Sequence, residues 1–164
     1  MLIPFLTTGQ PLAMFNTNFA LKNNVSTTPI SLTIEMKEKA GKIDAYFAKR
    51  KMPLEGYGEM MIRAGIENDL DWRLLPAIAI KESTGGKFAC HSNPFGWGSC
   101  KIKFESFEKA IDVVSDNLGG KNPNTARYYK DKTTEEKLWN YNTSVIPTYT
   151  KEILEFMDLI EKGK

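Results

Sequence analysis

The sequence has few of the residues that build metal centres or cross membranes. It holds one histidine, His91, and two cysteines, Cys90 and Cys100, fewer than the usual zinc ligand sets require. It has no apolar run long enough to span a bilayer. Its 22 basic and 20 acidic residues are interspersed, which is not typical of a nucleic-acid-binding surface. We therefore expect no bound metal, no membrane span and no nucleic-acid partner.

No glycine-rich stretch has the form of a nucleotide-binding loop. The TGGK cluster at 84–87 follows an apolar helical segment, whereas phosphate-binding loops follow strands. We therefore expect no cofactor. A chain of 164 residues with 41% hydrophobic content is long enough for one sizeable core but short for two independent domains. We expect a single globular domain that acts as a monomer.

Residues 1–32 differ in composition from the rest of the chain. They are rich in Thr, Asn, Pro and Ser, and their apolar residues follow neither a helical nor a strand period. No Lys or Arg precedes Lys22, so the charged start of a secretory signal is missing. We interpret residues 1–32 as an extended N-terminal lead or linker, and residues 33–164 as the functional domain. The lead is either the remnant of a trimmed export signal or a strap on the domain surface.

Apolar residues recur at helical spacing through most of residues 33–164, which predicts a mainly α fold. Asp71 is suited to cap a helix N-terminus, and Thr133 with Glu136 has the form of a capping box. Only GSCKIKF at 98–104 reads as a strand, so the expected class is mainly α with a very short β element. The predicted helices cover about 33–52, 56–72, 72–84, 106–118, a short segment from 133, and 148–161.

Glu82 stands at the end of an almost wholly apolar helical segment. Leu74, Leu75 and Ile78 precede it by eight, seven and four residues, spacings that share one helical face. Apolar surroundings and the negative end of the helix dipole both favour a protonated carboxyl. A carboxyl kept protonated near neutral pH is suited to general-acid catalysis of glycosidic cleavage. The alternative is that the helix ends at Lys81 and leaves Glu82 in water.

The loop that follows has the composition of a ligand-contacting turn. ACHSNPFGWGSC, at 89–100, combines Asn-Pro, two glycines and two aromatic residues. Glycine beside Trp97 permits close approach of backbone to a ligand, and aromatic faces pack against sugar rings. The alternative is a tight turn whose aromatic side chains belong to the core, and for Phe95 this alternative is favoured.

These motifs together resemble those of the lysozyme-like peptidoglycan hydrolases, most closely the glucosaminidase branch. The resemblance covers roughly Leu54 to Ile160, and the order of the motifs is more specific than any one of them. The Glu-Ser pair at 82–83 is also similar to the lytic transglycosylase signature. The resemblance implies a lysozyme-like, mainly α fold with a substrate groove and action on β-1,4 bonds of peptidoglycan glycan strands. The segments that carry it are AIAIKESTGG, NPFGWG, FESFEKAIDVVSDNL, YYKDKTTEEKLWNYN and PTYTKEILEFM.

The resemblance also assigns roles to particular residues. Glu82 matches the catalytic acid of both branches, and Tyr141, in NYNTS, matches a tyrosine that lies across the groove near that acid. Core or helix-entry packing is the alternative for Tyr141 and Tyr149. The substrate-binding residues that the resemblance implies are Ser83, Asn93, Phe95, Gly96, Trp97, Gly98 and Tyr149.

The chain departs from the glucosaminidase pattern where a second carboxylate is expected. Such enzymes often carry an added β-lobe with that second acid, but here only a few residues separate GWG at 96–98 from the next helix. Glu105 and Glu108 are the nearest candidates, although acids at a helix N-terminus are common because of the dipole alone. We therefore favour a single-acid mechanism. Glu82 would protonate the leaving oxygen, and the substrate's N-acetyl group or 6-hydroxyl would act as the nucleophile.

Cys90 and Cys100 bracket the loop, and they are the only cysteines. A disulfide between them would rigidify the loop and indicate an extracytoplasmic location, meaning secreted, periplasmic or cell-wall associated. The alternative is two reduced thiols in the cytosol.

Three functions are compatible with these sequence features. The first is a peptidoglycan glycosidase of the N-acetylglucosaminidase or lysozyme type. The second is a lytic transglycosylase that forms 1,6-anhydro products. The third is a non-catalytic glycan-binding domain, which the presence of both Glu82 and Tyr141 disfavours.

Overall fold

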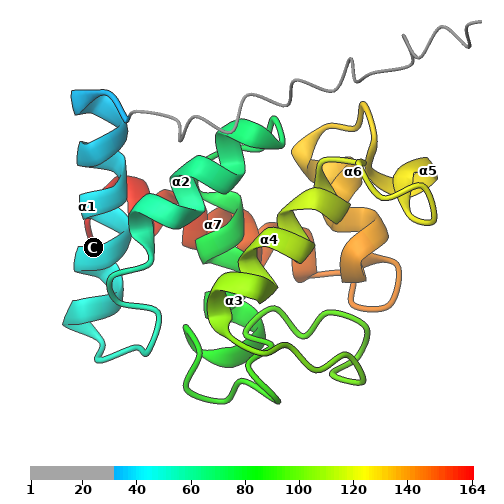
Figure 1. The fold of residues 1–164 in the computed structure, drawn as a ribbon, viewed down its shortest axis with the longest axis horizontal. Helices are drawn as coiled ribbons and strands as arrows, with labels where there is room; N and C mark the ends of the chain where they lie inside the picture. The colour runs from blue at the N-terminus through cyan, green and yellow to red at the C-terminus, as the bar shows by residue number, and fades with distance from the viewer. Residues whose placement is uncertain (1–31) are drawn as a thin grey trace, which may run out of the picture.

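The computed structural model describes residues 32–164, so the predicted N-terminal lead lies outside the described residues apart from Leu32. The described part of the chain is mainly α-helical, as predicted. In Figure 1, α1 lies at one end and α5 and α6 at the other, with α2, α4 and α7 between them. The helices are α1 (Ile34–Lys49), α2 (Gly58–Glu67), α3 (Leu74–Ser83), α4 (Phe107–Leu118), α5 (Ala126–Tyr129), α6 (Thr134–Leu138), the π-helix η1 (Trp139–Thr143) and α7 (Tyr149–Glu161).

Helix α3 forms the centre of the core. Every residue from Leu74 to Ile80 is buried, as expected of a helix that is apolar on all sides. It packs against α7 and α2. Lys81 forms an ion pair with Glu152 of α7, and Thr148 donates a hydrogen bond to the same carboxylate at 2.7 Å. The ion pair joins the C-terminal end of α3 to α7, and the Thr148 hydrogen bond orients the Glu152 carboxylate within the first turn of α7.

Side-chain caps begin three of the described helices, α1, α4 and α6. Thr133 and Glu136 form the predicted capping box at the start of α6. Asp71 was predicted as the N-cap of α3, and this is wrong because Arg73 occupies the N-cap position. The Asp71 carboxylate instead accepts a hydrogen bond from the Arg73 backbone N–H at 2.9 Å, which closes a turn before the helix.

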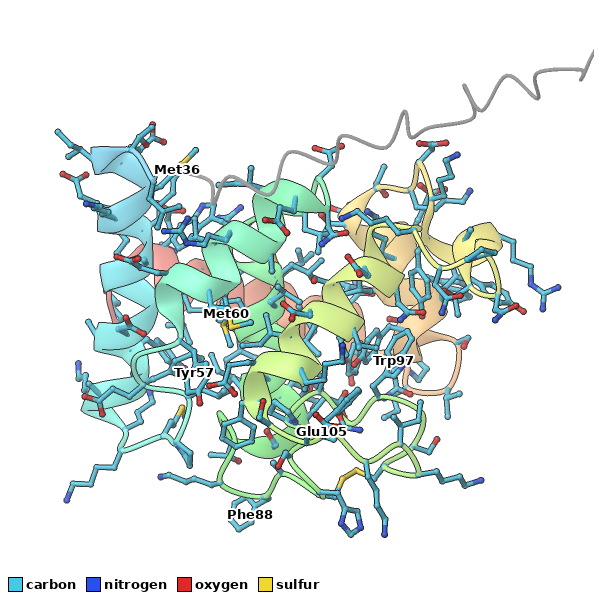
Figure 2. All side chains as sticks on the ribbon, in the orientation of Figure 1. Met36, Tyr57, Met60, Phe88, Trp97 and Glu105 are labelled. Carbon is cyan, nitrogen blue, oxygen red and sulfur yellow. A yellow bond between two sulfur atoms is a disulfide. The ribbon has the colours of Figure 1, made fainter. Side chains whose placement is uncertain are left out.

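The predicted strand at 98–104 is wrong. Within residues 32–164, the β structure is an isolated bridge between Cys90 and Asn93. The Asn93 carboxamide donates to the carbonyl oxygens of Trp97 at 2.8 Å and Ile102 at 3.2 Å. These loop carbonyls are thus satisfied by a side chain instead of a neighbouring strand. The disulfide of this loop and the exposed side chain of Phe88 lie at the edge of the molecule in Figure 2.

Two elements near the end of the chain were not predicted. Helix α5 has four residues, too few for a periodic pattern. The π-helix η1 follows α6 directly, and a π-helix is a rare element that is frequently found at functional sites. Both elements contribute residues to the pocket that contains Glu82.

Candidate active site

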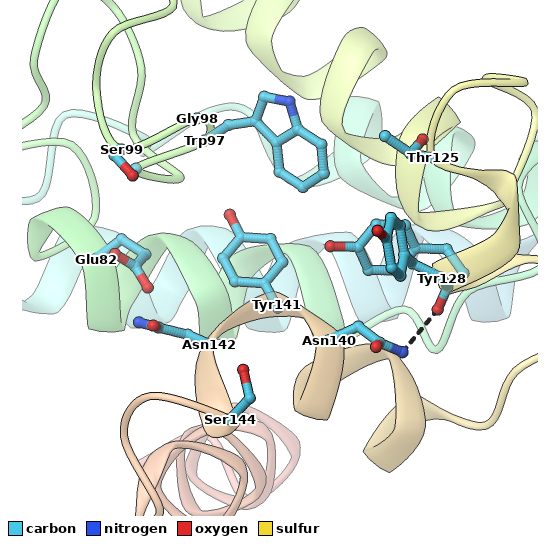
Figure 3. Close-up of a pocket in the computed structure, with 12 residues that line it drawn as sticks. Glu82, Trp97, Gly98, Ser99, Thr125, Tyr128, Asn140, Tyr141, Asn142 and Ser144 are labelled. Carbon is cyan, nitrogen blue, oxygen red and sulfur yellow. Dashed lines mark hydrogen bonds between the residues drawn. The ribbon is translucent and has the colours of Figure 1, made fainter.

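A cavity of about 640 Å³ opens beside the C-terminal end of α3. Figure 3 shows Glu82 and Asn142 at one end of this pocket and Thr125 and Tyr128 at the other, with Tyr141 between them. A volume of this size fits a ligand of several rings. The pocket is lined by Glu82, Gly96, Trp97, Gly98, Ser99, Thr125, Tyr128, Tyr129, Asn140, Tyr141, Asn142 and Ser144.

Glu82 lies in the last turn of α3, and its side chain is half-buried. The Tyr149 hydroxyl donates a hydrogen bond to Glu82 Oε1 at 2.7 Å. Burial raises the pKa of Glu82 above its ordinary value, while the Tyr149 hydrogen bond and the charge of Lys81 partly oppose this rise. The predicted direction of the pKa shift is confirmed, and the alternative of a solvated Glu82 beyond the helix end is wrong.

The second carboxyl oxygen of Glu82 faces Gly96. The backbone of Gly96 has φ of +62°, and a Cβ atom at this position would lie 2.7 Å from Glu82 Oε2. Any larger residue here would therefore collide with the carboxyl group and strain the backbone. Because Oε1 already accepts the Tyr149 hydrogen bond, a proton on the carboxyl group belongs on Oε2.

Three aromatic side chains, of Trp97, Tyr141 and Tyr149, form a cluster next to this carboxyl group. The rings of Tyr141 and Tyr149 are nearly parallel, with centroids 6.0 Å apart, and Trp97 lies 5.5 Å from Tyr141. Tyr141 donates a hydrogen bond to the Phe95 carbonyl oxygen at 2.5 Å. Burial raises the pKa of Tyr141 and of Tyr149 well above the usual value, so both phenols remain hydrogen-bond donors.

The structure divides the expected substrate-binding residues into two groups. Gly96, Trp97 and Gly98 line the pocket together with Glu82 and Tyr141. The other four have buried side chains. We expected these side chains to contact substrate, but their burial gives them a supporting role instead. These four are Ser83, Asn93, Phe95 and Tyr149.

The buried residues hold the pocket loop against α3. Ser83 Oγ donates to the Pro94 carbonyl oxygen at 2.7 Å and accepts from the Gly86 N–H at 2.9 Å. Asn93 Oδ1 accepts from the Trp97 N–H at 3.0 Å. Phe95 belongs to the core, which was the favoured alternative for this residue. These contacts set the position of Gly96 and Trp97 relative to Glu82.

A disulfide joins Cys90 and Cys100, whose Cα atoms are 6.0 Å apart. The predicted pairing is therefore confirmed, and two free thiols are excluded. The bond closes the loop that carries Asn93, Gly96 and Trp97, which restricts its freedom in the unfolded chain.

Neither of the candidate second acids reaches the pocket. Glu108 is exposed at the start of α4 and accepts a hydrogen bond from Tyr57 at 3.0 Å. Glu105 is exposed and does not belong to the lining. Among the described residues that line the pocket, Glu82 is the one carboxylic acid.

Several lining residues were missed by sequence reasoning. One comes from the loop between α3 and α4, and one directly precedes α5. The others come from α5, from η1 and from the turn after η1. None of these local sequences gives a clear signal of a pocket. The sequence offered one clue to Asn140 and Asn142. Both are neighbours of Tyr141, which the resemblance placed at the groove. The missed residues are Ser99, Thr125, Tyr128, Tyr129, Asn140, Asn142 and Ser144.

Residues 32–164 contain neither a cluster of metal-ligating side chains nor a membrane-spanning helix. This part of the chain has no group of three or more His, Cys, Asp or Glu side chains placed to hold a metal ion. It also has no helix with the length and apolar character needed to cross a membrane.

The fold and pocket define a mainly α-helical protein with one half-buried acid in an aromatic and polar pocket. No family model matches the chain, and no curated protein or solved structure is significantly similar to it. A function must therefore be inferred from the chemistry of the pocket.

Proposed function

We propose that this protein is a glycosidase that cleaves β-1,4 bonds between N-acetylglucosamine and N-acetylmuramic acid in peptidoglycan. The observation that supports this most is the Glu82 carboxyl group, which has a raised pKa and lies in a pocket lined by aromatic and amide side chains. A protonated carboxyl group can deliver a proton to a departing sugar oxygen. The ordered sequence motifs supply the substrate class.

In this mechanism, Glu82 Oε2 protonates the glycosidic oxygen while the bond from that oxygen to the sugar C1 breaks. The carbonyl oxygen of the sugar's own 2-acetamido group bonds to C1 and forms an oxazolinium ion. Glu82, now a carboxylate, takes a proton from water as the water oxygen attacks C1 and reopens the acetamido group. One acid is sufficient for both steps, which agrees with the single carboxyl group among the described lining residues.

The pocket walls suit a chain of sugars. The faces of Trp97, Tyr128 and Tyr141 offer apolar surface to sugar rings. Asn140, Asn142 and Ser144 add polar side chains to the lining of the pocket. The partner in this proposal is a peptidoglycan glycan strand, bound by a monomer.

A lytic transglycosylase is the second candidate, because the Glu82-Ser83 pair and the single acid fit that reaction equally well. The substrate's 6-hydroxyl would then attack C1 and give its proton to Glu82. A glycan-binding domain without catalysis is the third candidate, but binding alone would not require a carboxyl group with a raised pKa.

The disulfide supports a location outside the cytoplasm, because such bonds persist in oxidising compartments. We therefore propose that the protein acts as a secreted, periplasmic or cell-wall-associated enzyme.

Mass spectrometry of fragments released from purified peptidoglycan tests this proposal. Reducing N-acetylglucosamine ends would identify a glucosaminidase, and reducing N-acetylmuramic acid ends would identify a muramidase. Anhydro ends would identify a transglycosylase. If the protein binds several wall types but releases no fragments from any of them, the binding-domain alternative is correct.

A further inference from the structure

Asn142 is the polar side chain that lies beside Glu82 at the same end of the pocket (Figure 3). Its side chain is half-buried, and its carboxamide makes no hydrogen bond to any residue from 32 to 164. The carboxamide of Asn140, by contrast, donates to the carbonyl oxygens of Tyr128 at 2.8 Å and Glu136 at 2.9 Å. The Asn142 carboxamide is thus available to a ligand next to Glu82, whereas the Asn140 carboxamide is held by the two bonds that its nitrogen donates.

The backbone around Asn142 is held firmly. Its carbonyl oxygen accepts hydrogen bonds from the N–H groups of Val145 at 3.0 Å and Ile146 at 2.8 Å. Thr143, the next residue, bonds to the Leu138 carbonyl oxygen at 3.1 Å and to the Thr150 hydroxyl at 2.6 Å, which ties η1 to α7. The carboxamide is therefore presented from a fixed backbone, which lowers the cost of orienting a ligand.

We propose that Asn142 binds the 2-acetamido group of the sugar at the cleaved bond and orients it for attack on C1. Asn142 Oδ1 would accept the acetamido N–H, while Glu82 Oε2 faces the glycosidic oxygen. This inference rests on the proposed glycosidase function and names the residue that takes the place of a second acid.

A neutral acceptor is better suited to this position than a carboxylate. A negative charge next to Glu82 would raise the pKa of Glu82 further and retard its ionisation when it delivers the proton. Asn142 accepts the N–H without adding that charge. As C1 bonds to the acetamido oxygen, positive charge develops on the acetamido nitrogen, so the hydrogen bond to Asn142 strengthens in the transition state.

A double-mutant cycle, in which one change is made in the enzyme and the other in the substrate, tests this role of Asn142. Cleavage rates are measured on a soluble peptidoglycan oligosaccharide and on an analogue whose acetamido N–H at the cleaved sugar is replaced by oxygen. Asn142→Ala should lower kcat by about 10²-fold on the natural oligosaccharide, the usual effect of removing one group that stabilises the transition state. It should have no effect on the analogue, which has no N–H to bind. The exposed Asn124→Ala serves as a matched control and should change neither rate.

Asn142→Asp provides a second variant that keeps the acceptor. It should retain more activity than Asn142→Ala and move the alkaline limb of the pH-rate profile upward. Equal losses on both substrates, or no loss on either, would overturn the role of Asn142 while leaving the glycosidase function intact. If the wild-type protein fails to cleave the natural oligosaccharide, the proposed function itself is wrong.

Discussion

At the residue scale, the chemistry centres on how Glu82 is held. One carboxyl oxygen accepts a hydrogen bond from Tyr149, and the other faces the backbone of Gly96. Burial raises the pKa of Glu82, and the Tyr149 hydrogen bond opposes that rise because it stabilises the carboxylate. The burial of Glu82 and its two contacts lead to three predictions, each for a single substitution.

Tyr149→Phe should shift the pH dependence of catalysis. The variant removes a hydrogen bond that favours the charged carboxylate, so the pKa of Glu82 should rise further. Because a general acid must be protonated, activity falls as pH rises through this pKa. The alkaline limb of the kcat/KM profile should therefore move to higher pH than in the wild type. An alkaline limb that stays in place or moves down would contradict the assigned contact.

Glu82→Gln should stabilise the protein relative to the wild type, and the difference should grow as pH rises. A raised folded-state pKa means that the stabilisation from the protonated carboxyl is fully present below the ordinary pKa of 4.5 and is lost as pH rises through the folded pKa. Glutamine resembles the protonated form at every pH. The Tm of Glu82→Gln should thus be similar to that of the wild type at about pH 4 and higher than that of the wild type at about pH 8.

A Glu38→Gln substitution on the exposed surface of α1 is the matched control for this stability series. If Glu82→Gln is no more stable than the wild type at alkaline pH, burial does not disfavour the charged form of Glu82.

Gly96→Ala should impair catalysis by displacing the Glu82 carboxyl. The new Cβ would lie 2.7 Å from Glu82 Oε2, at a backbone φ of +62°. A displacement of about 1 Å can lower activity by about 10²-fold. Gly41→Ala is the matched control, since Gly41 lies inside α1 with no atom within 4 Å of the added Cβ. That control should leave activity unchanged and stabilise the protein by about 0.5–1 kcal/mol. Enzyme kinetics and urea unfolding of both variants check this prediction. Wild-type activity in Gly96→Ala would contradict it.

At the element scale, the pocket depends on two segments without regular α-helical structure. The loop after α3 is fixed by Ser83, Asn93 and the disulfide, and η1 is fixed by the Thr143 hydrogen bonds. The first segment brings Gly96 and Trp97 to Glu82, and the second brings Tyr141 and the neighbouring amides. Loosening either segment should affect the pocket more than the helical core.

The double variant Cys90→Ser/Cys100→Ser tests the first segment. A loop closed over a sequence separation of 10 residues should contribute about 2.5–3 kcal/mol in the loop-entropy description. The midpoint of urea unfolding should fall accordingly, and activity should fall as well because Trp97 and Gly96 become less fixed. Reduction of the wild-type disulfide provides a matched measurement that should give the same loss. Equal unfolding midpoints for the oxidised wild type and the double variant would refute this contribution.

At the scale of the whole molecule, local sequence signals predicted the helices better than they predicted the pocket. The Thr133 capping box is visible in a few residues, and so is the spacing that places Glu82 on the apolar face of α3. The strand predicted at 98–104 did not form because the side chain of Asn93, which lies just before that segment, satisfies the carbonyl oxygens of Trp97 and Ile102.

The pocket could be predicted only in part, for a related reason. Glu82, Gly96, Trp97 and Tyr141 were found because motifs carry them. Apart from Ser99 in the loop after α3, the remaining wall comes from Thr125, α5, η1 and the following turn, which meet Glu82 only through long-range packing. No local pattern distinguishes a pocket-lining asparagine from a surface asparagine, so Asn142 emerged only from the three-dimensional arrangement.

The most direct test of the account is the rate of peptidoglycan cleavage by wild type and by Glu82→Gln, compared at the pH of maximal wild-type activity. Glutamine keeps the shape of the side chain and the acceptor for Tyr149, but it has no proton to deliver. Cleavage should fall by about 10²–10⁴-fold, the usual contribution of a general acid, while wall binding persists. A Glu82→Gln protein that cleaves at the wild-type rate would contradict the central role of Glu82.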